Sequence, residues 1–171
     1  MYFPVKYGTC SYSVNISPKV GVNISTVYGE FSENFAAEIP GCTGDSRGYW
    51  ATGISLVAHM NSPLIPAAHF NTRFISTQKQ WFGGGCDLTP VFADEAEKKL
   101  FHDRLEKVCN KTNKKYYPDF KKQCDEYFYL PHRGEHRGIG GIFFDYLNTD
   151  NWQKDFDFVQ QVGLAFKDVM A

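Results

Sequence analysis

The sequence predicts an α+β domain, because segments with the two-residue alternation of strands are followed by segments with the 3.6-residue periodicity of helices. The strand-like segments fall mainly in the first ninety residues, and most helical patterns follow them. With 171 residues, of which 43% are apolar and 22% charged, the chain has the length and composition of one ordinary globular domain. We therefore treat residues 1–171 as a single domain, whose elements are taken in order below.

Two segments early in the chain have the composition of strands. Residues 20–27 are rich in β-branched side chains, and residues 53–59 form a largely apolar run that ends in a histidine. Because successive side chains of a strand point to opposite faces, Ser55 and His59 are expected on the same face of the second strand. The polar stretch between the two strands is expected to contain one helical turn at residues 33–39.

Residues 68–76 alternate cleanly and place three polar side chains on one strand face. His69, Asn71 and Arg73 share this face, and mainly apolar side chains occupy the other. Arg73 can hold a carboxylate through parallel charge-assisted hydrogen bonds, and His69 can carry a proton near neutral pH. The face therefore indicates an enzyme site for an anionic small molecule. A solvated polar face on an edge strand is the alternative interpretation.

An aromatic strand end, three glycines and an aspartate follow one another in residues 81–90. The glycines are expected to form a turn whose backbone can approach a ligand closely, since glycine has no Cβ. No Lys-Ser or Lys-Thr follows them and the G-x-G-x-x-G spacing is absent, which argues against a phosphate loop. Asp87 can accept a hydrogen bond from a substrate N–H or act as a base. A turn or capping aspartate is the alternative.

Three helices and one strand are expected in the second half. The first helix begins after Asp94, with a glutamate three residues on, and the second begins at Pro118. A buried strand covers residues 138–146, and the last helix follows it. That helix reaches Ala171 without a Gly, Asn or Pro stop signal, so we expect a chain cut from a longer protein. The apolar residues expected to be buried on the first and last helices are Ala96, Leu100, Phe101, Leu105, Val108, Cys109, Trp152, Phe156, Val159, Gly163 and Phe166.

The histidines and cysteines do not form a recognisable metal motif. Four histidines lie on four separate elements without H-E-x-x-H or H-x-H spacing, namely His59, His69, His102 and His132. A metal site is one interpretation of them, and core or surface histidines are the alternative. The five cysteines are odd in number and lack C-x-x-C spacing, so we expect reduced, buried thiols.

A polar, glycine-rich cluster precedes the strand at residues 138–146. Its charged or titratable members are Arg133, Glu135, His136 and Arg137. Such a cluster is ordinarily a solvated loop, but at the entrance of a strand it can also close over an acidic ligand.

Charge and hydropathy exclude two classes of partner. The formal net charge is −1, which gives no electrostatic footprint for nucleic acid or an anionic membrane. No apolar stretch is as long as a membrane span, and the first residues lack the features of a secretory signal. We therefore expect a cytoplasmic protein.

Long motifs run through the chain from about Gly21 to Phe166. The most specific are WFGGGCDLTP at residues 81–90 and CDEYFYLPHRGEHRGIGG at residues 124–141, supported by GVNISTVYG, GISLVAH and HFNTRF. Together they resemble the oxygen-dependent coproporphyrinogen III oxidase family of haem biosynthesis. The resemblance implies a large, mainly antiparallel β-sheet flanked by helices on both faces and paired as a homodimer. Periodicity alone predicts only the α+β class.

The resemblance also implies an activity. Members of the family oxidatively decarboxylate two propionate side chains of coproporphyrinogen III to vinyl groups, which gives protoporphyrinogen IX. They use molecular oxygen as the oxidant and release CO₂ and hydrogen peroxide. Bacterial-type members are described as binding a divalent metal, and others as needing none. The expected partner is thus a small-molecule tetrapyrrole, with no nucleic acid and no membrane span.

Single residues receive roles from the same resemblance. His69 matches the family's proton donor, and Asp87 matches the aspartate that holds the pyrrole N–H groups. With Arg73, which is expected to anchor a propionate, these two form the expected catalytic set. The substrate-binding matches are Ser55, Asn71, Thr72 and Arg73. The metal-binding matches are His59, His69, His102 and His132.

The sequence departs from the family pattern in several places. The usual I-H-P-K-N-P after the strand of Ser55 is AHMNSP here, Gln80 replaces one residue of a tandem tryptophan, and the glycine-rich N-terminal loop is altered. We expect the C-terminal part, with further strands and much of the dimer contact, to be absent, which would leave apolar surface exposed. Two alternatives stay open: an inactive tetrapyrrole-binding fragment, and a histidine-based metalloenzyme acting on a small carboxylate.

Overall fold

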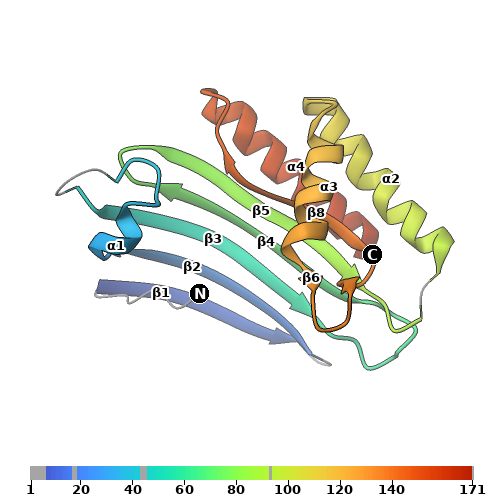
Figure 1. Ribbon diagram of the computed structural model, residues 1–171. Coiled ribbons are helices and arrows are strands. Elements are labelled where there is room, and N and C mark those ends of the chain that lie inside the picture. The colour runs from blue at the N-terminus through green and yellow to red at the C-terminus, as the bar shows by residue number, and fades with distance from the viewer. Residues whose placement is uncertain (1–6, 17–18, 43–45, 93, 171) are drawn as a thin grey trace.

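The computed structural model describes residues 7–16, 19–42, 46–92 and 94–170, with side chains from residue 19 onward. Six strands form one antiparallel sheet in the order β1-β2-β3-β4-β5-β8, and β8 joins the edge after two helices have intervened (Figure 1). A separate short hairpin pairs β6 with β7. The strands are β1 (Tyr7–Ile16), β2 (Val20–Glu30), β3 (Gly48–Ala58), β4 (Ala67–Ser76), β5 (Gln80–Thr89), β6 (Tyr129–Leu130), β7 (Glu135–His136) and β8 (Gly140–Leu147).

Helices lie on both faces of the sheet, which confirms the architecture implied by the resemblance. α2 (Glu95–Thr112) and α4 (Trp152–Met170) pack over the β4, β5 and β8 end of the sheet, and α3 (Tyr116–Tyr127) lies along β8 (Figure 1). The single turn α1 (Glu33–Ala36) packs against Tyr49, which the pleat of β3 turns to the opposite face. Among the described helices, none is long and apolar enough to cross a membrane.

The core lies between the sheet and helices α2, α3 and α4. The side chains of β4 alternate as predicted, so that Ala68, Phe70 and Phe74 face the helices. Phe70 stacks on Phe166 of α4 with ring centroids 5.1 Å apart, and Phe144 of β8 is fully buried. Truncating one buried phenylalanine to alanine typically costs about 3–5 kcal/mol of stability. This packing fixes which face of β4 is turned away from the helices.

The glycine run at residues 83–85 lies inside β5 and not in a turn, so that sequence prediction is wrong. β5 is continuous and pairs with β4 on one side and β8 on the other. A Cβ added at Gly85 would collide with the carbonyl oxygen of Ile142 in β8. Glycine is therefore required because the neighbouring strand passes very close. Asp87 accordingly lies within the strand, neither in a turn nor at a helix cap.

Most other elements agree with the sequence predictions. Asp94 caps α2, because its side chain accepts hydrogen bonds from the N–H groups of Ala96 and Glu97. β1 is a strand that the weak patterning of the first twenty residues did not predict. Ala96, Leu100 and Trp152, all expected to be buried, are exposed, Leu100 by 55% and Trp152 by 43%. Leu100 faces solvent, and Trp152 lies at the first turn of α4, where it covers the edge of the aromatic core.

The cysteines within the described side chains are free thiols, as predicted, and Cys10 lies outside that set. Cys86, Cys109 and Cys124 are buried. Burial raises the pKa of Cys109 and of Cys124 to about 12. Both are therefore protonated and poorly reactive at neutral pH.

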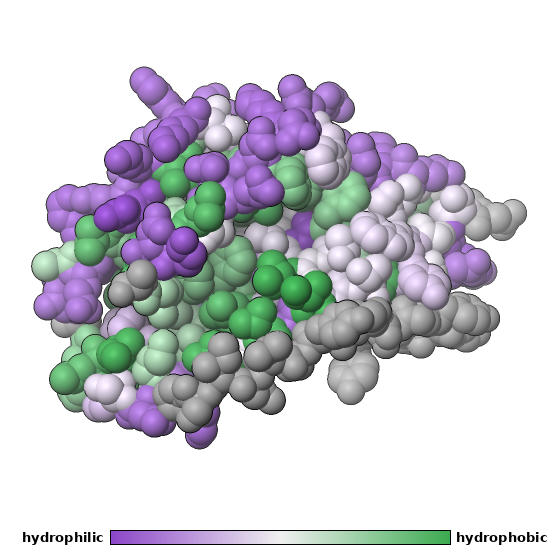
Figure 2. Space-filling view, turned by 180° about the vertical axis from the view of Figure 1, so that it is seen from behind, coloured by the Kyte–Doolittle hydropathy of each residue, from purple (hydrophilic) through white to green (hydrophobic). Residues whose placement is uncertain are grey.

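Part of the sheet face on the helix side is not covered by any of the described helices. Ile24, Tyr28 and Trp50, which lie on this face of β2 and β3, are 50%, 48% and 41% exposed. The view from behind shows apolar side chains gathered beside the polar helix surfaces (Figure 2). The exposed apolar surface expected from the sequence is thus present.

His102 of α2 is held in the packing between α2, α3 and β8. It is 9% exposed, and its Nε2 donates to the carbonyl oxygen of Ile139 at 2.9 Å. Its Nδ1, 3.1 Å from the hydroxyl of Tyr117, therefore accepts a hydrogen bond from that group in the neutral ring. Burial lowers the pKa of His102 and raises the pKa of Tyr117 to about 12, so both groups stay uncharged at neutral pH.

The stability of the fold is expected to decrease as pH falls below about 6.5, because burial lowers the pKa of His102 and the unfolded chain takes up this proton more readily than the folded one. Above that pH the ring is neutral in both states and its contribution is complete. The free energy of unfolding from urea titrations at pH 7.5, 6.5 and 5.5 measures the effect. His102→Gln should show a smaller pH dependence than the wild type, and His132→Gln, at an exposed position, should match the wild type. Equal pH dependence in all three proteins would contradict this account.

Candidate active site

Five side chains from three neighbouring strands form a surface that we call the polar face: Ser55, His69, Asn71, Arg73 and Asp87. Strand pleating turns them away from α2 and α4. The register places His69 opposite Asp87 and Asn71 beside Ser55. His69 and Arg73 lie four positions apart along the extended strand, a span of about 13 Å. The sheet thus brings together side chains that lie on three separate segments of the sequence.

Arg73 lies at one end of the polar face in a partly exposed ion pair. Its Nη2 donates to Oδ2 of Asp145 at 2.7 Å, and its Nη1 donates to Oδ1 of Asn71 at 3.3 Å. The guanidinium carbon also lies 5.6 Å from the ring centroid of Phe143. The side chains of Arg73 and Asp145 are 33% and 31% exposed. Solvent-screened pairs of this kind contribute about 0–1 kcal/mol, so a competing carboxylate can replace Asp145 at small cost.

Asp145 reaches Arg73 across a glycine. β5 lies between β4 and β8, the strands that carry the two side chains, and a Cβ added at Gly83 would lie 2.7 Å from Oδ1 of Asp145 and 2.8 Å from Nε of Arg73. The register of β5 and β8 also shifts between residues 82 and 84. Tyr146, which follows Asp145, has a φ of 55°, an uncommon conformation for a residue with a side chain. The glycine and the bulged edge together create room for the pair.

Asp87 lies at the other end of the polar face and is 2% exposed. Arg137 covers it, because Nε and Nη2 of Arg137 donate to Oδ2 of Asp87 at 2.9 and 2.7 Å. The guanidinium of Arg137 in turn lies over the ring of Phe128, 3.8 Å from its centroid. Two charge-assisted hydrogen bonds thus compensate the buried carboxylate. Arg137 of the polar cluster before β8 supplies this cover, whereas the cluster's other members are exposed, as expected for a solvated loop.

His69 approaches the remaining oxygen of Asp87. Its Nδ1 lies 3.4 Å from Oδ1 of Asp87, but within the described residues this buried nitrogen has no hydrogen-bond partner of good geometry. The ring of His59 stands edge-on to it, with centroids 5.7 Å apart. A buried polar atom without a partner is costly, and a catalytic role is one explanation for such an atom. His69 and Asp87 are close enough to exchange a proton after a small movement.

Ser55 and Thr72, both expected to contact the substrate, lie on opposite faces of the sheet. Ser55 is exposed and lies across from Asn71, so its hydroxyl belongs to the polar face. Thr72 points its side chain to the opposite face, because neighbouring residues of a strand alternate. The tripeptide from Asn71 to Arg73 therefore supplies two side chains and one stretch of main chain to the polar face.

The four histidines expected from the resemblance to bind metal do not converge. His59 lies beside His69, whereas His132 is exposed in the turn between β6 and β7 and His102 uses both ring nitrogens within the packing of α2. Among the described side chains, no three His, Cys, Asp or Glu residues are grouped to hold a metal ion. As placed in this chain, these residues do not fit a divalent cation.

Two members of the site were missed by the sequence predictions. Phe143 and Asp145 lie on β8, where they alternate with the buried Ile142 and Phe144. From that alternation, the sheet face on which Phe143 and Asp145 lie could have been predicted. Their partner Arg73 was not predictable, because the pair depends on the order in which β8 joins the sheet.

Comparison with known proteins identifies the family. A sequence model of the coproporphyrinogen III oxidase family matches residues 9–171. The oxygen-dependent coproporphyrinogen-III oxidase of Rickettsia bellii (strain OSU 85-389) is 62% identical over 151 residues, which cover 88% of this chain and 54% of that protein. The proteins of the same name from Rickettsia akari (strain Hartford) and Rickettsia africae (strain ESF-5) are 62% and 60% identical with the same coverage.

The chain therefore spans about half the length of the curated relatives that it matches. The matched half includes every residue of the polar face, since the family match begins at residue 9 and continues to residue 171. The resemblance carried by the glycine-rich strand and the charged cluster is confirmed, and the chain belongs to the coproporphyrinogen III oxidase family.

Proposed function

We propose that the chain provides the substrate-binding sheet of an oxygen-dependent coproporphyrinogen III oxidase, which converts two propionates of coproporphyrinogen III to vinyl groups. Its similarity to proteins named for this activity supports the proposal. The alternative is a chain that binds the tetrapyrrole without turning it over. The coverage of only 54% of the relatives' length is the observation that keeps this alternative open.

The observation that carries the proposal is the separation of Arg73 from the pair of His69 and Asp87 on one face. A span of about 13 Å suits a ligand with a broad flat centre and a carboxylate on an extended arm. Arg73 is one-third exposed and suits the carboxylate. Asp87 suits the N–H groups of the macrocycle, and its Oδ1 is the oxygen that Arg137 leaves unoccupied.

In the proposed reaction each propionate loses its carboxyl group as CO₂, and its two remaining carbons become a vinyl group. Molecular oxygen takes up two electrons and two protons to form hydrogen peroxide, with one proton coming from the propionate and one from the medium. His69 moves a proton in this scheme, and positioned transfer of this kind contributes about 10²–10⁴ in rate. Asp87 accepts hydrogen bonds from the pyrrole N–H groups and so helps make the ring electron-rich.

We assign no step to a divalent metal, because the four histidines as placed do not form a ligand set. The active enzyme in this proposal is a homodimer, as the resemblance implies.

Aerobic incubation of the chain with coproporphyrinogen III is expected to yield vinyl products, detected as protoporphyrin fluorescence after oxidation. Arg73→Gln should lower kcat/KM by about 10- to 100-fold, the loss expected for charge-assisted hydrogen bonds to a carboxylate. Arg104→Gln removes the same charge from the exposed side of α2 and should have no effect. Binding of the tetrapyrrole without product would favour the non-catalytic alternative. Absence of both binding and product would refute the proposed function.

Asp87→Asn should lower turnover by at least about 100-fold while the protein stays folded. The substitution keeps the size of the side chain and one acceptor oxygen, and Arg137 keeps contact with water because its side chain is 30% exposed. Turnover and the thermal unfolding midpoint are measured together. Asp103→Asn, at an exposed position of α2, is the matched control. If Asp87→Asn forms vinyl product at a near-normal rate, Asp87 has no part in the chemistry.

A further inference from the structure

The ion pair with Asp145 occupies the guanidinium of Arg73, the group that would bind a carboxylate of the proposed substrate. Only one oxygen of Asp145 contacts Arg73, through Oδ2 at 2.7 Å. The other oxygen, Oδ1, accepts a hydrogen bond from the N–H of Tyr146 at 2.9 Å. Asp145 therefore binds Arg73 through one bond, where a free carboxylate can make two parallel ones.

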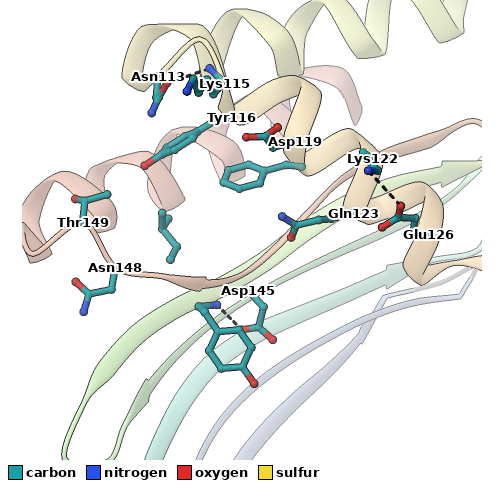
Figure 3. A pocket seen from close by; sticks show the side chains of 13 residues that line it. Asn113, Lys115, Tyr116, Asp119, Lys122, Gln123, Glu126, Asp145, Asn148 and Thr149 are labelled. Atoms are coloured by element: carbon teal, nitrogen blue, oxygen red, sulfur yellow. Dashed lines mark hydrogen bonds and ion pairs between the residues drawn. The ribbon is translucent and has the colours of Figure 1, made fainter. Parts of the chain in front are cut away.

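The structure also provides space for Asp145 away from Arg73. A cavity of about 520 Å³ lies between α3 and the chain that follows β8, and Asp145 is one of its lining residues. Figure 3 shows Asp145 on the sheet side of this cavity and Gln123 and Lys122 on the α3 side. The ammonium of Lys122 is already paired with Glu126 at 3.7 Å, so the amide of Gln123 is the donor available to a displaced carboxylate.

Solvent exposure decides how readily the exchange occurs. Arg73 and Asp145 are 33% and 31% exposed, so their attraction is screened and the pair is weak. A ligand carboxylate replaces it with a stronger bidentate contact. A neutral group of the same shape offers no negative charge and leaves Asp145 in place.

We propose that Asp145 is a positioning residue that competes with the ligand for Arg73: it is an internal carboxylate that a charged ligand carboxylate replaces and a neutral arm does not. Asp145 thus holds the guanidinium in place before the ligand binds and lowers the affinity for a ligand carboxylate. This inference rests on the proposed function for the identity of the ligand. Gly83 is required for this ion pair, since any side chain at that position would occupy the space of Arg73 and Asp145.

The test measures binding of coproporphyrin III, the stable oxidised tetracarboxylate, by quenching of tryptophan fluorescence. Asp145→Asn keeps the shape and the acceptor for Tyr146 but removes the charge that competes for Arg73. It should tighten binding about fivefold, the order expected when a weak, screened ion pair no longer has to be broken. The neutral tetra-amide of coproporphyrin III should bind with a Kd changed less than about twofold in the same variant.

Asp119→Asn is the matched control, because Asp119 lines the same cavity and is exposed on α3. It changes the net charge equally and should leave the Kd of coproporphyrin III unchanged. Adding Arg73→Gln to Asp145→Asn should abolish the gain.

Weaker or unchanged binding of coproporphyrin III by Asp145→Asn, with binding by the wild type intact, would overturn the inference alone. An equal gain for the tetra-amide would overturn it too, because the effect would not depend on the ligand's charge. If neither the wild type nor Asp145→Asn binds coproporphyrin III, the proposed function fails and the inference fails with it.

Discussion

The pleat of β4 is the constraint on which the site depends. Ala68, Phe70 and Phe74 must face the helices, because they pack against buried aromatic rings that include Phe166. Since strand side chains alternate, the residues between them are forced onto the other face. A register slip of one residue would bury the polar set and expose the apolar one, at a cost of many buried contacts. The core therefore fixes the positions of the site residues, although it does not touch them.

The charges on the polar face are arranged so that each has a compensating partner. Arg73 is paired with Asp145 in a solvent-screened contact, and Asp87 is paired with Arg137 in a buried one. The first pair is weak and exchangeable, and the second is held by two short hydrogen bonds. One end of the face is thus suited to exchanging partners with a ligand. The other end is suited to keeping a carboxylate in one position beside His69.

Much of this site was predictable from local pattern. The alternation of residues 68–76 gave the correct face for His69, Asn71 and Arg73, because one side of the strand is apolar. The same rule, applied to the family's tripeptide, places Thr72 on the other face. The cap at Asp94 was predictable because it depends only on the next three residues.

Other features depend on contacts distant in sequence and were not predictable. Three glycines in a row are typical of turns, yet here they lie in β5, which is paired on both sides, and β8 passes close to them. The pairing of Arg137 with Asp87 joins residues fifty positions apart. The pairing of Arg73 with Asp145 depends on a register shift that no local pattern records.

A crystal structure of the chain with coproporphyrin III bound tests the central claim most directly. The account predicts that the macrocycle lies on the polar face, with one carboxylate bonded to Arg73 and the ring nitrogens directed towards Asp87. A macrocycle bound instead on the exposed apolar surface around Ile24 and Trp50, on the opposite side of the sheet, would contradict it.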